Sequence, residues 1–530
     1  MRGICKVMAG FWALLALAVG VIGGAAGAAD DPVVPARSKP ADMAAAAAYA
    51  PENNVIVIEI SEYAGYAGLI YANGGLEPNP DSLFAREFGF MVRLVVSESE
   101  DWSPLNAGQI AAAPTTVDVL AVYGGKLKVR VPVLLGFSRG TTGLIVDNDI
   151  RRVNDLKGRR VALCQFTEAD FFMRYLAGEA SLSVKSLDSL DDPADPEAVN
   201  FVYTEDAFGA GDLYARERAA QTGRLAGCVT WDPKTTEVVE ASEGAARLLV
   251  TNRNLLIVAD ILLVNAGFAE KHPEWIAGLV RGILRGNAAV RENPAVAAPS
   301  LAKAFGWSAE DSASELSKVH LANWPENKAF FSGQIDSAGS FGYLYETALD
   351  IYGPEISRLA APPQSFLLPA ALEQANAGGA FNGQVAQIKP MTAGGADVEA
   401  QELLSKNLYF YFDPNSSVLT ADRETENREQ LETIRRWLRV SPGSRVLLRG
   451  HADGSRLAEI EQKEGAEKAR AARLALKSLS QERCAALRER LTEGGVEANR
   501  VETRAVGADE PTGQGPAADR RVEAQWFTME

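Results

Sequence analysis

Alternating apolar and polar blocks divide the chain, and the period of each apolar block indicates a strand or a helix. The sequence VIVIEI at 55–60 is rich in β-branched residues and predicts a buried strand that leads into a helix start. Further β-type runs follow, with helical patterns between most of them: Met91–Val96, Val117–Val122, Val131–Leu135, Gly143–Val146, Arg160–Leu163, Val199–Tyr203, Gly227–Trp231 and Leu255–Val264. This alternation favours an α/β fold with an open, mostly parallel sheet covered by helices.

The pattern changes near Pro362. Residues 361–400 are rich in Ala, Gly, Gln, Asn and Pro and predict a linker, with one short helical piece at Pro369–Ala375. Residues 401–530 then predict a separate domain. We expect its strands at 408–412, 445–448, 501–506 and 521–526, an amphipathic helix at 422–439, and a largely helical stretch from 455 to about 492. These elements predict an α+β sandwich.

The N-terminus has the features of a secretory signal peptide. The apolar run Val7–Ile22 follows two basic residues and precedes the small residues Ala25–Ala29, so we expect residues 1–28 to be removed on export to the periplasm. The run is shorter than the roughly 20 residues of a spanning helix. Cys5 precedes the run, so we expect no lipid anchor at a cleavage site.

Composition narrows the classes of function further. Cys164, Cys228 and Cys484 remain after cleavage, an odd number without metal-like spacing, so we expect no disulfide framework, metal or cofactor. Cys164 and Cys228 are expected on neighbouring strands but beyond disulfide reach. The first 400 residues hold 47 acidic and 32 basic residues, whereas residues 401–530 hold 22 and 21. This negative excess argues against nucleic acid as a partner of the first 400 residues.

One internal repeat suggests two related halves. GQIAAAPT at 108–115 and GRLAGCVT at 223–230 share a Gly, an aliphatic residue, small residues and a final Thr. Each would deliver a Thr to the carboxyl end of a strand, where open α/β sheets bind ligands. We therefore expect Thr115 and Thr230 on opposite walls of a cleft. A chance match of short Ala- and Gly-rich segments is the alternative.

Residues from about 50 to 360 resemble the solute-binding proteins of ABC importers for nitrate, alkylsulfonates and taurine, and their thiamine-precursor-binding relatives. The resemblance rests on LNAGQI at 105–110, TTGLIV at 141–146, NDLKGRRVA at 154–162 and WDP at 231–233. It implies a two-lobed periplasmic-binding-protein fold of type II, with lobe I formed by about 50–140 and 265–360 and lobe II by 147–255. It also implies a small-molecule ligand and an inner-membrane ABC permease as partner.

A cleft that closes on a ligand needs groups at strand ends and helix N-termini of both lobes. Hydroxyls and a guanidinium would orient a polar head, and aromatic rings would hold an apolar body. The candidates are Ser61, Tyr63, Tyr66, Thr115, Thr116, Arg139, Thr141, Gln165, Phe166, Thr167, Trp231 and Asp232. Packing or helix capping is the alternative role for each of them.

The charge of the ligand stays open at this point. The resemblance implies an anion such as a sulfonate or nitrate. However, five acidic residues also lie near the predicted strand ends and would repel an anion if they face the cleft: Glu62, Glu168, Asp170, Glu205 and Asp232.

An enzyme is the other class to consider. GFSRG at 136–140 matches the G-x-S-x-G pattern, which requires a strand, a strained turn and then a helix around the nucleophile. A β-type run follows here instead. The three histidines, His272, His320 and His451, have no recognisable setting for a general base. We therefore expect no catalytic site.

The last 130 residues resemble the OmpA-like domain, which binds the diaminopimelate-containing peptide of peptidoglycan. The matching strings are GHADGS at 450–455, LSQER at 479–483 and DRRVE at 519–523. The resemblance implies that Asp453 accepts hydrogen bonds from the ligand's ammonium group and that Arg483 holds its carboxylate. Arg520 and Arg521 match the closing pair of arginines.

The spacing departs from that of the family. Asp453 and Arg483 are about twice as far apart as usual, because Leu457–Lys477 adds a helical stretch, and Leu476 stands where the family commonly has Asn. A structural ion pair between Asp453 and Arg483 is the alternative role. For the whole chain we expect a periplasmic, peptidoglycan-associated solute-binding protein. The alternative is a structural or sensory scaffold with degenerate lobes.

Overall fold

The computed structural model describes residues 32–97, 101–253, 255–333, 339–386, 408–441 and 443–527. The expected signal peptide and residues 387–400 of the expected linker lie outside these residues. Among the described residues, no helix combines the length and the apolar character needed to cross a bilayer. The described residues from Val33 onward belong to one compact unit.

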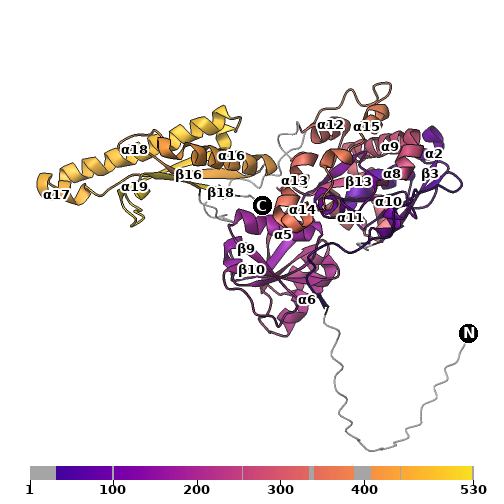
Figure 1. The fold of residues 1–530 in the computed structure, drawn as a ribbon, viewed down its shortest axis with the longest axis horizontal. Coiled ribbons are helices and arrows are strands. Elements are labelled where there is room, and N and C mark those ends of the chain that lie inside the picture. Colours follow the sequence, from indigo (N-terminus) through magenta and orange to yellow (C-terminus); the bar gives the residue numbers. More distant parts are fainter. Residues whose placement is uncertain are drawn as a thin grey trace, which may run out of the picture. The chain divides into compact units, whose positions relative to one another are not determined.

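The described residues up to 386 hold two separate mixed sheets (Figure 1), which confirms the two-lobed α/β architecture predicted from the sequence. The first-lobe sheet has the order β14-β6-β13-β4-β2-β3, with β5 paired to β13. Its strands are β2 (Val55–Ile60), β3 (Met91–Val96), β4 (Ala112–Thr116), β5 (Val129–Arg130), β6 (Leu134–Ser138), β13 (Ala259–Asn265) and β14 (Val319–Leu321).

The second-lobe sheet has the order β1-β10-β8-β11-β7-β12, with β9 paired to β10. Its strands are β1 (Val33–Val34), β7 (Thr142–Asp147), β8 (Arg160–Cys164), β9 (Ser183–Leu187), β10 (Ala198–Thr204), β11 (Gly227–Trp231) and β12 (Ala246–Thr251). Cys228 pairs with Ala162, so Cys164 lies two residues farther along β8. Both side chains are buried, and they form no disulfide with each other.

The sheets are more antiparallel than the alternation of elements predicted. Only β2 with its two neighbours, and β8 with β10, β11 and β9, run parallel. The chain leaves the first lobe at β6 and returns as β13, which pairs antiparallel with both β4 and β6. The return strand β13 therefore lies in the middle of the first-lobe sheet, antiparallel to its neighbours β4 and β6.

Helices cover the faces of both sheets. In the first lobe these are α1 (Ala67–Asn73), α2 (Leu83–Phe88), α3 (Ser103–Asn106), α4 (Val117–Tyr123), α8 (Ala266–Lys271), α9 (Pro273–Glu292), α10 (Ala298–Phe305), α11 (Ala309–Ser317), α12 (Trp324–Ser332), α13 (Phe341–Tyr352), α14 (Pro354–Ser357) and α15 (Pro369–Ala375). In the second they are α5 (Glu168–Glu179), α6 (Ala207–Ala219) and α7 (Lys234–Ala241). Helices α1 and α9 touch closely, because a Cβ at Gly286 would lie 2.0 Å from the carbonyl oxygen of Gly68.

The strand expected at Val117–Val122 is wrong, because this segment is helix α4. Every residue of the helix is buried. A short segment that is apolar on all sides shows neither the two-residue period of a half-buried strand nor the 3.6-residue period of a surface helix. Its β-branched content then favoured the wrong element.

The beginning of the expected linker belongs to the first lobe. Helix α15 forms at Pro369–Ala375, as predicted, but Phe366, Leu372 and Phe381 are each 3% exposed. The backbone of Phe366 accepts a hydrogen bond from Val131. The packed chain thus continues at least to Phe381, about twenty residues beyond the change in composition.

The C-terminal domain has a four-stranded sheet of order β15-β18-β16-β17. Its strands are β15 (Leu408–Tyr411), β16 (Arg445–His451), β17 (Val501–Gly507) and β18 (Arg521–Phe527), and its helices are α16 (Glu424–Val440), α17 (Leu457–Glu464), α18 (Ala466–Glu493) and α19 (Pro516–Asp519). Trp437 of α16 stacks on Trp526 of β18 at 5.4 Å between ring centroids. The stacked rings hold the helix against the sheet.

The inserted residues lengthen α18, which has 28 residues and is drawn in yellow in Figure 1. At 1.5 Å per residue the helix is about 42 Å long, whereas a seven-residue strand spans about 23 Å. The N-terminal half of α18 therefore extends past the sheet. It is largely exposed there, and Leu474 has 63% of its surface open.

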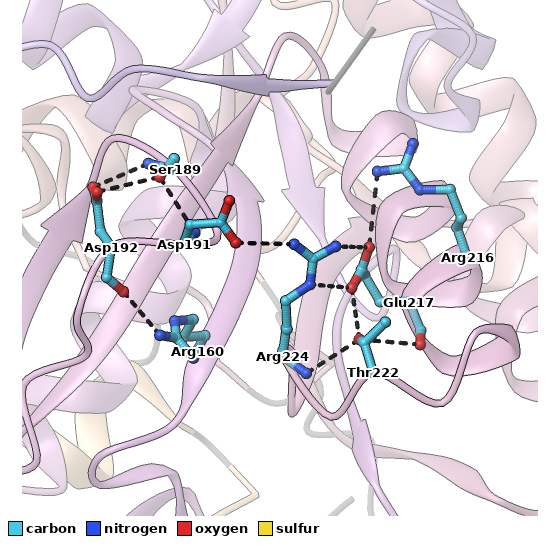
Figure 2. A network of polar contacts seen from close by, with 8 residues as sticks. All are labelled: Arg160, Ser189, Asp191, Asp192, Arg216, Glu217, Thr222 and Arg224. Carbon is cyan, nitrogen blue, oxygen red and sulfur yellow. Dashed lines mark hydrogen bonds and ion pairs between the residues drawn. The ribbon is translucent and has the colours of Figure 1, made fainter. Parts of the chain in front are cut away.

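A polar network fastens the loops of the second lobe at the end of the sheet where β8 begins (Figure 2). Arg224 lies between Asp191 and Glu217 and donates two hydrogen bonds of 2.8 Å to Glu217. Thr222 also donates to Glu217. Burial raises the pKa of Glu217, but the hydrogen bonds from Arg224 and Thr222 outweigh it and lower the pKa overall. The carboxylate is thus held in its charged form.

We predict that Arg224→Ala lowers the free energy of unfolding by about 2 kcal/mol at pH 7, because Glu217 stays buried without its main partner. Arg216→Ala is the matched control. Its guanidinium lies 3.9 Å from Glu217 and is 46% exposed, so its loss should cost under about 1 kcal/mol. Urea unfolding measures both.

The pH dependence checks the cause. A lowered pKa gives stability above the unfolded pKa of about 4.5 that is lost as the pH falls through the folded value. The difference between Arg224→Ala and the parent chain should therefore shrink between pH 6 and pH 3. An equal difference at both values would mean that Arg224 acts through packing and not through charge.

Candidate functional site

A cleft opens where the two lobes meet, with about 1100 Å³ free of protein atoms, open solvent at its mouth included. The first lobe contributes the loop after β2, the ends of β4 and β6, and a segment of β13. The second lobe contributes the start of β7, the first residue of α5, Phe208 of α6 and the end of β11. The cleft is therefore walled by both lobes, which a protein that encloses a small molecule requires.

Eight of the twelve predicted ligand-binding residues line this cleft. They are Ser61, Tyr63, Tyr66, Thr115, Thr116, Thr141, Trp231 and Asp232. Parallel strands and the loops that follow them explain the result, since β2, β4 and β11 all end at this crevice.

The other four predicted residues are turned elsewhere. Arg139 directs its Nε to the carbonyl oxygen of Arg253 at 3.4 Å, and Gln165 exchanges two hydrogen bonds of 2.8 Å with the backbone of Arg37. Phe166 packs against Tyr352, and Thr167 donates to the carbonyl of Cys164 at 2.9 Å. None of the four is among the described residues that line the cleft.

Of the two threonines that the internal repeat predicted on opposite walls of the cleft, only one lies there. Thr115 lines it, but Thr230 is fully buried and donates to the carbonyl oxygen of Ala207 at 2.7 Å. Thr230 therefore fastens α6 to β11 and does not face the ligand space. The neighbouring residue, Trp231, lines the cleft instead, because successive side chains of a strand point to opposite faces.

Carboxyl groups dominate the charge of the cleft. Seven acidic residues line it, namely Glu59, Glu62, Asp101, Glu168, Asp232, Asp260 and Glu315, and no Lys or Arg is among the described lining residues. Sequence reasoning placed Glu62, Glu168 and Asp232 near strand ends. It also named Asp170, which instead pairs with Arg174 at 2.6 Å, and Glu205, which lies outside the lining.

Asp260 also lines the cleft, but it was not predicted from the sequence. It lies in β13 between Thr116 of β4 and Gly136 of β6, and only 5% of its surface is exposed. The hydroxyl of Tyr63 donates to its Oδ2 at 3.0 Å. Burial raises the pKa of Asp260 to about 8, against the opposing hydrogen bond from Tyr63 and with a further contribution from Asp118. The sequence ADILLVN offered only one signal, a single acid in an apolar strand.

A second buried acid lies behind Asp260. Asp118, in the first turn of α4, is 1% exposed. Burial raises its pKa to about 7. Two carboxyl groups of raised pKa thus share one end of the first-lobe sheet, which is a common feature of functional sites.

Lys318 joins the two lobes and was missed by sequence reasoning. Its Nζ lies 2.6 Å from Asp232 Oδ2 in the second lobe and 2.6 Å from Glu315 Oε1 in α11 of the first. Asp232 also accepts hydrogen bonds from Thr235 and Thr236 at the start of α7. Asp232 therefore serves as a lobe-to-lobe contact as well as a cleft residue.

Six aromatic residues complete the lining: Tyr63, Tyr66, Trp102, Phe208, Trp231 and Trp307. Tyr63 and Tyr66 meet edge to face at 5.2 Å, and Phe208 and Trp231 do so at 5.9 Å from the opposite lobe. The indole of Trp307 donates to Glu62. Aromatic surface from both lobes can thus contact an apolar or cationic guest.

The G-x-S-x-G segment forms a strand, a turn and a second strand. Ser138 ends β6, and β7 begins at Thr142. The hydroxyl of Ser138 is hydrogen bonded to Thr141 and accepts from Asn252 Nδ2 at 2.7 Å. The strand–turn–helix setting of a hydrolase nucleophile is therefore not formed here. Groups of three or more potential metal ligands are absent from the described residues of the chain.

In the C-terminal domain, Asp453 and Arg520 lie at one surface, with Arg520 Nη1 3.9 Å from Asp453 Oδ2. Both side chains are partly exposed, at 25% for Asp453 and 19% for Arg520. Asp453 Oδ1 accepts from the backbone of Ser455 at 2.9 Å, which fixes the carboxylate. The pair thus presents an acid and a base to solvent side by side.

Arg483 lies behind this pair and has no exposed surface. Its three nitrogens donate to the carbonyl oxygens of Ser416, His451 and Asp413 at 2.9, 2.9 and 3.2 Å. Burial lowers the pKa of Arg483 to about 10, assisted by Arg520 and opposed by Asp453. Its charge therefore acts on the surface pair from beneath.

Arg521 is turned to the other side of β18. It donates two hydrogen bonds, of 2.8 and 2.7 Å, to Glu523 Oε1. Although burial raises the pKa of Glu523, the nearby ring of His451 and the hydrogen bonds from Arg521 hold it at about 2. Among the described residues, the ion-pair partners of Arg521 are Glu523 and Asp519 and do not include Asp453.

Comparison with known proteins identifies the C-terminal domain. Residues 411–525 match the model of the OmpA family, which confirms the domain predicted from its motifs. No match to this chain is found among curated proteins.

Solved structures resemble the two-lobed region of the chain. The alkanesulfonate-binding protein SsuA of Xanthomonas axonopodis pv. citri bound to MOPS shares 14% identity at a TM-score of 0.42, over 60% of this chain and 99% of that one. The periplasmic nitrate-binding protein NrtA of Synechocystis shares 13% at 0.43, over 62% and 90%. The desulfurization enzyme DSZB shares 14% at 0.41, over 61% and 99%.

We predict that Asp260→Asn raises the melting temperature of the ligand-free protein, by more at pH 9 than at pH 5. A raised folded pKa means that the unfolded state releases its proton first, so the buried acid destabilises the fold as the pH rises above about 4. The penalty reaches its full size above about pH 8. Calorimetry at both pH values measures it.

Asp350→Asn is the control, because it removes the same charge from an exposed position of α13. It should leave the melting temperature unchanged at either pH. Equal melting temperatures for Asp260→Asn and the parent chain at pH 9 would contradict the raised pKa of Asp260.

Proposed function

We propose that this chain is a secreted solute-binding protein, held at the cell wall by its C-terminal domain. The observation that carries the proposal is the cleft, whose lining comes from strand ends of two separate lobes. Two lobes joined by the short connections after β6 and β12 can close on a small molecule and open to release it. The sequence motifs shared with solute-binding proteins support the same function.

The C-terminal domain supports attachment to peptidoglycan. The exposed acid and base of Asp453 and Arg520 suit a zwitterionic group such as the end of a diaminopimelate side chain, which carries an ammonium and a carboxylate. Arg483 would contribute its positive charge from beneath, and Arg521 would stabilise the sheet. This division of roles differs from the direct contacts that the resemblance implied for Arg483.

The two activities fit one location. A wall-bound capture module raises the local concentration of its ligand near a partner in the inner membrane. We propose an ABC permease as this partner and the periplasm as the location. The chain would act by binding and not by catalysis, since the one nucleophile motif lies in a strand–turn–strand segment.

A scaffold is the second candidate function. The contact of Lys318 with Asp232 joins the two lobes directly, which would also suit lobes that serve a structural or sensory role. The two candidates differ in one observable property, the retention of a small molecule.

We predict that the protein, purified under native conditions, retains a small molecule that mass spectrometry detects on denaturation. A thermal-shift panel of sulfonates, nitrate, phosphate, pyrimidines and small amines should contain at least one stabilising compound. Trp231→Leu should abolish that shift because Trp231 lines the cleft. Tyr71→Leu, at a surface tyrosine outside the lining, should leave it intact.

The scaffold would be favoured if no compound of the panel raises the melting temperature and native mass spectrometry detects no bound small molecule. A shift that survives Trp231→Leu would place the binding site outside the cleft.

We predict that Asp453→Asn weakens co-sedimentation with purified sacculi by about tenfold, because an ammonium group loses its charged acceptor. Asp509→Asn is the matched control, since Asp509 is an exposed acid of the same domain. Circular dichroism checks that both variants fold. Equal pelleting of Asp453→Asn and the parent chain would rule out this site as the wall contact.

A further inference from the structure

The lining of the cleft is acidic on both sides. Glu59, Asp260 and Glu315 belong to the first lobe, and Glu168 and Asp232 belong to the second. A ligand enclosed between the lobes would therefore meet carboxyl groups from each wall. This arrangement is independent of the exact degree of closure, because the acids are carried by both lobes.

Lys318 and Arg139 are the basic residues to consider near the cleft. Lys318 contacts Asp232 and Glu315 together, so one cation serves two carboxylates. Arg139, the base expected to orient an anion, is buried and faces the carbonyl of Arg253. The described lining residues therefore offer an anion no lysine or arginine.

Among the acidic lining residues, Asp260 has a carboxyl group that is held in a fixed position. The carboxyl group is 95% buried, stands on the central strand β13, and is held by the hydroxyl of Tyr63. A buried carboxylate is costly unless a positive group lies beside it. Because the hydroxyl that donates to Asp260 is neutral, a positively charged ligand would supply the missing counter-charge.

The aromatic lining points to the same chemistry. Tyr63 and Tyr66 on one wall, and Trp231 on the other, present ring surface to the space that the carboxyl groups surround. Aromatic faces attract cations, most strongly where water is excluded, and alkylated ammonium groups use both the ring faces and a nearby carboxylate. An anion gains nothing from these faces.

We propose that the cleft binds a small organic cation, with a positively charged nitrogen beside Asp260 and alkyl or methyl groups against Tyr63, Tyr66 and Trp231. The proposal rests on the cleft being a solute-binding site. It replaces the sulfonate or nitrate that the family resemblance implied, because the one candidate arginine is turned away and the acids face inwards.

Isothermal titration of the mature full-length protein tests the charge of the ligand directly. The probes are choline and putrescine as cations, 3,3-dimethyl-1-butanol as the neutral isostere of choline, and ethanesulfonate as an anion. We expect at least one cation to bind at least about tenfold more tightly than both the neutral isostere and the anion. Asp260→Asn should weaken that binding by about tenfold or more, and the exposed control Asp350→Asn should not.

The pH dependence separates Asp260 from the other acids. Choline keeps its charge at every pH, so its affinity should rise as Asp260 loses its proton between pH 6 and pH 9. The titratable groups around Asp260 are Tyr63 and Asp118 of α4, with Glu168 and Glu315 farther along the lining. The pKa of Tyr63 is raised well above 10, mainly by burial and further by Asp260 and Tyr66. Tyr63 therefore stays neutral across this range. Asp260→Asn should reduce the rise.

Glu168→Gln provides a second variant from the opposite lobe if Asp260→Asn alters the fold, and it too should weaken cation binding. Tighter binding of ethanesulfonate or the neutral alcohol would overturn the cation proposal and leave solute capture intact. Failure of every probe to bind would also overturn it, and native mass spectrometry would then decide separately whether the cleft holds any solute.

Discussion

The return of the chain into the middle of the first-lobe sheet is the constraint on which the other features depend. Strand β13 pairs with β4 on one side and with β6 on the other. This insertion obliges the chain to leave the first lobe after β6 and to return to it after β12. These two connections hold the carboxyl ends of β2, β4 and β11 around one space, and they set Asp260 at its edge. Without the central position of β13, the acid would lie at an exposed sheet margin.

Sequence patterns predicted the architecture well, but only some of the cleft residues. The β-branched runs marked most strands because burial on both faces selects such residues, and strand ends led to Ser61, Thr115 and Trp231. Helix α4 was mistaken for a strand because its residues are buried on all sides. Arg139 was assigned to the ligand by its position after β6, but the direction of a side chain depends on neighbours such as Arg253 that lie distant in sequence.

The charged residues of the cleft show which features cannot be predicted from a single sequence. Asp260 lies inside an apolar strand, where periodicity gives no reason to single it out, and Lys318 follows a surface helix far from any motif. Their importance arises from tertiary pairing, which joins residues 86 positions apart in the case of Lys318 and Asp232. In the C-terminal domain the motifs singled out Asp453 and Arg483, and the charge of Asp453 acts on the pKa of Arg483. The burial of Arg483 behind Arg520 became visible only once the sheet was assembled.

The contact between Lys318 and Asp232 also sets an electrostatic cost on opening the cleft. A movement that separates the lobes at this point pulls Lys318 away from Asp232, and these charged side chains are 24% and 6% exposed. Mobile ions screen a pair this deeply buried much less than an exposed one. The contact should thus hold the lobes together in dilute buffer and in concentrated salt alike.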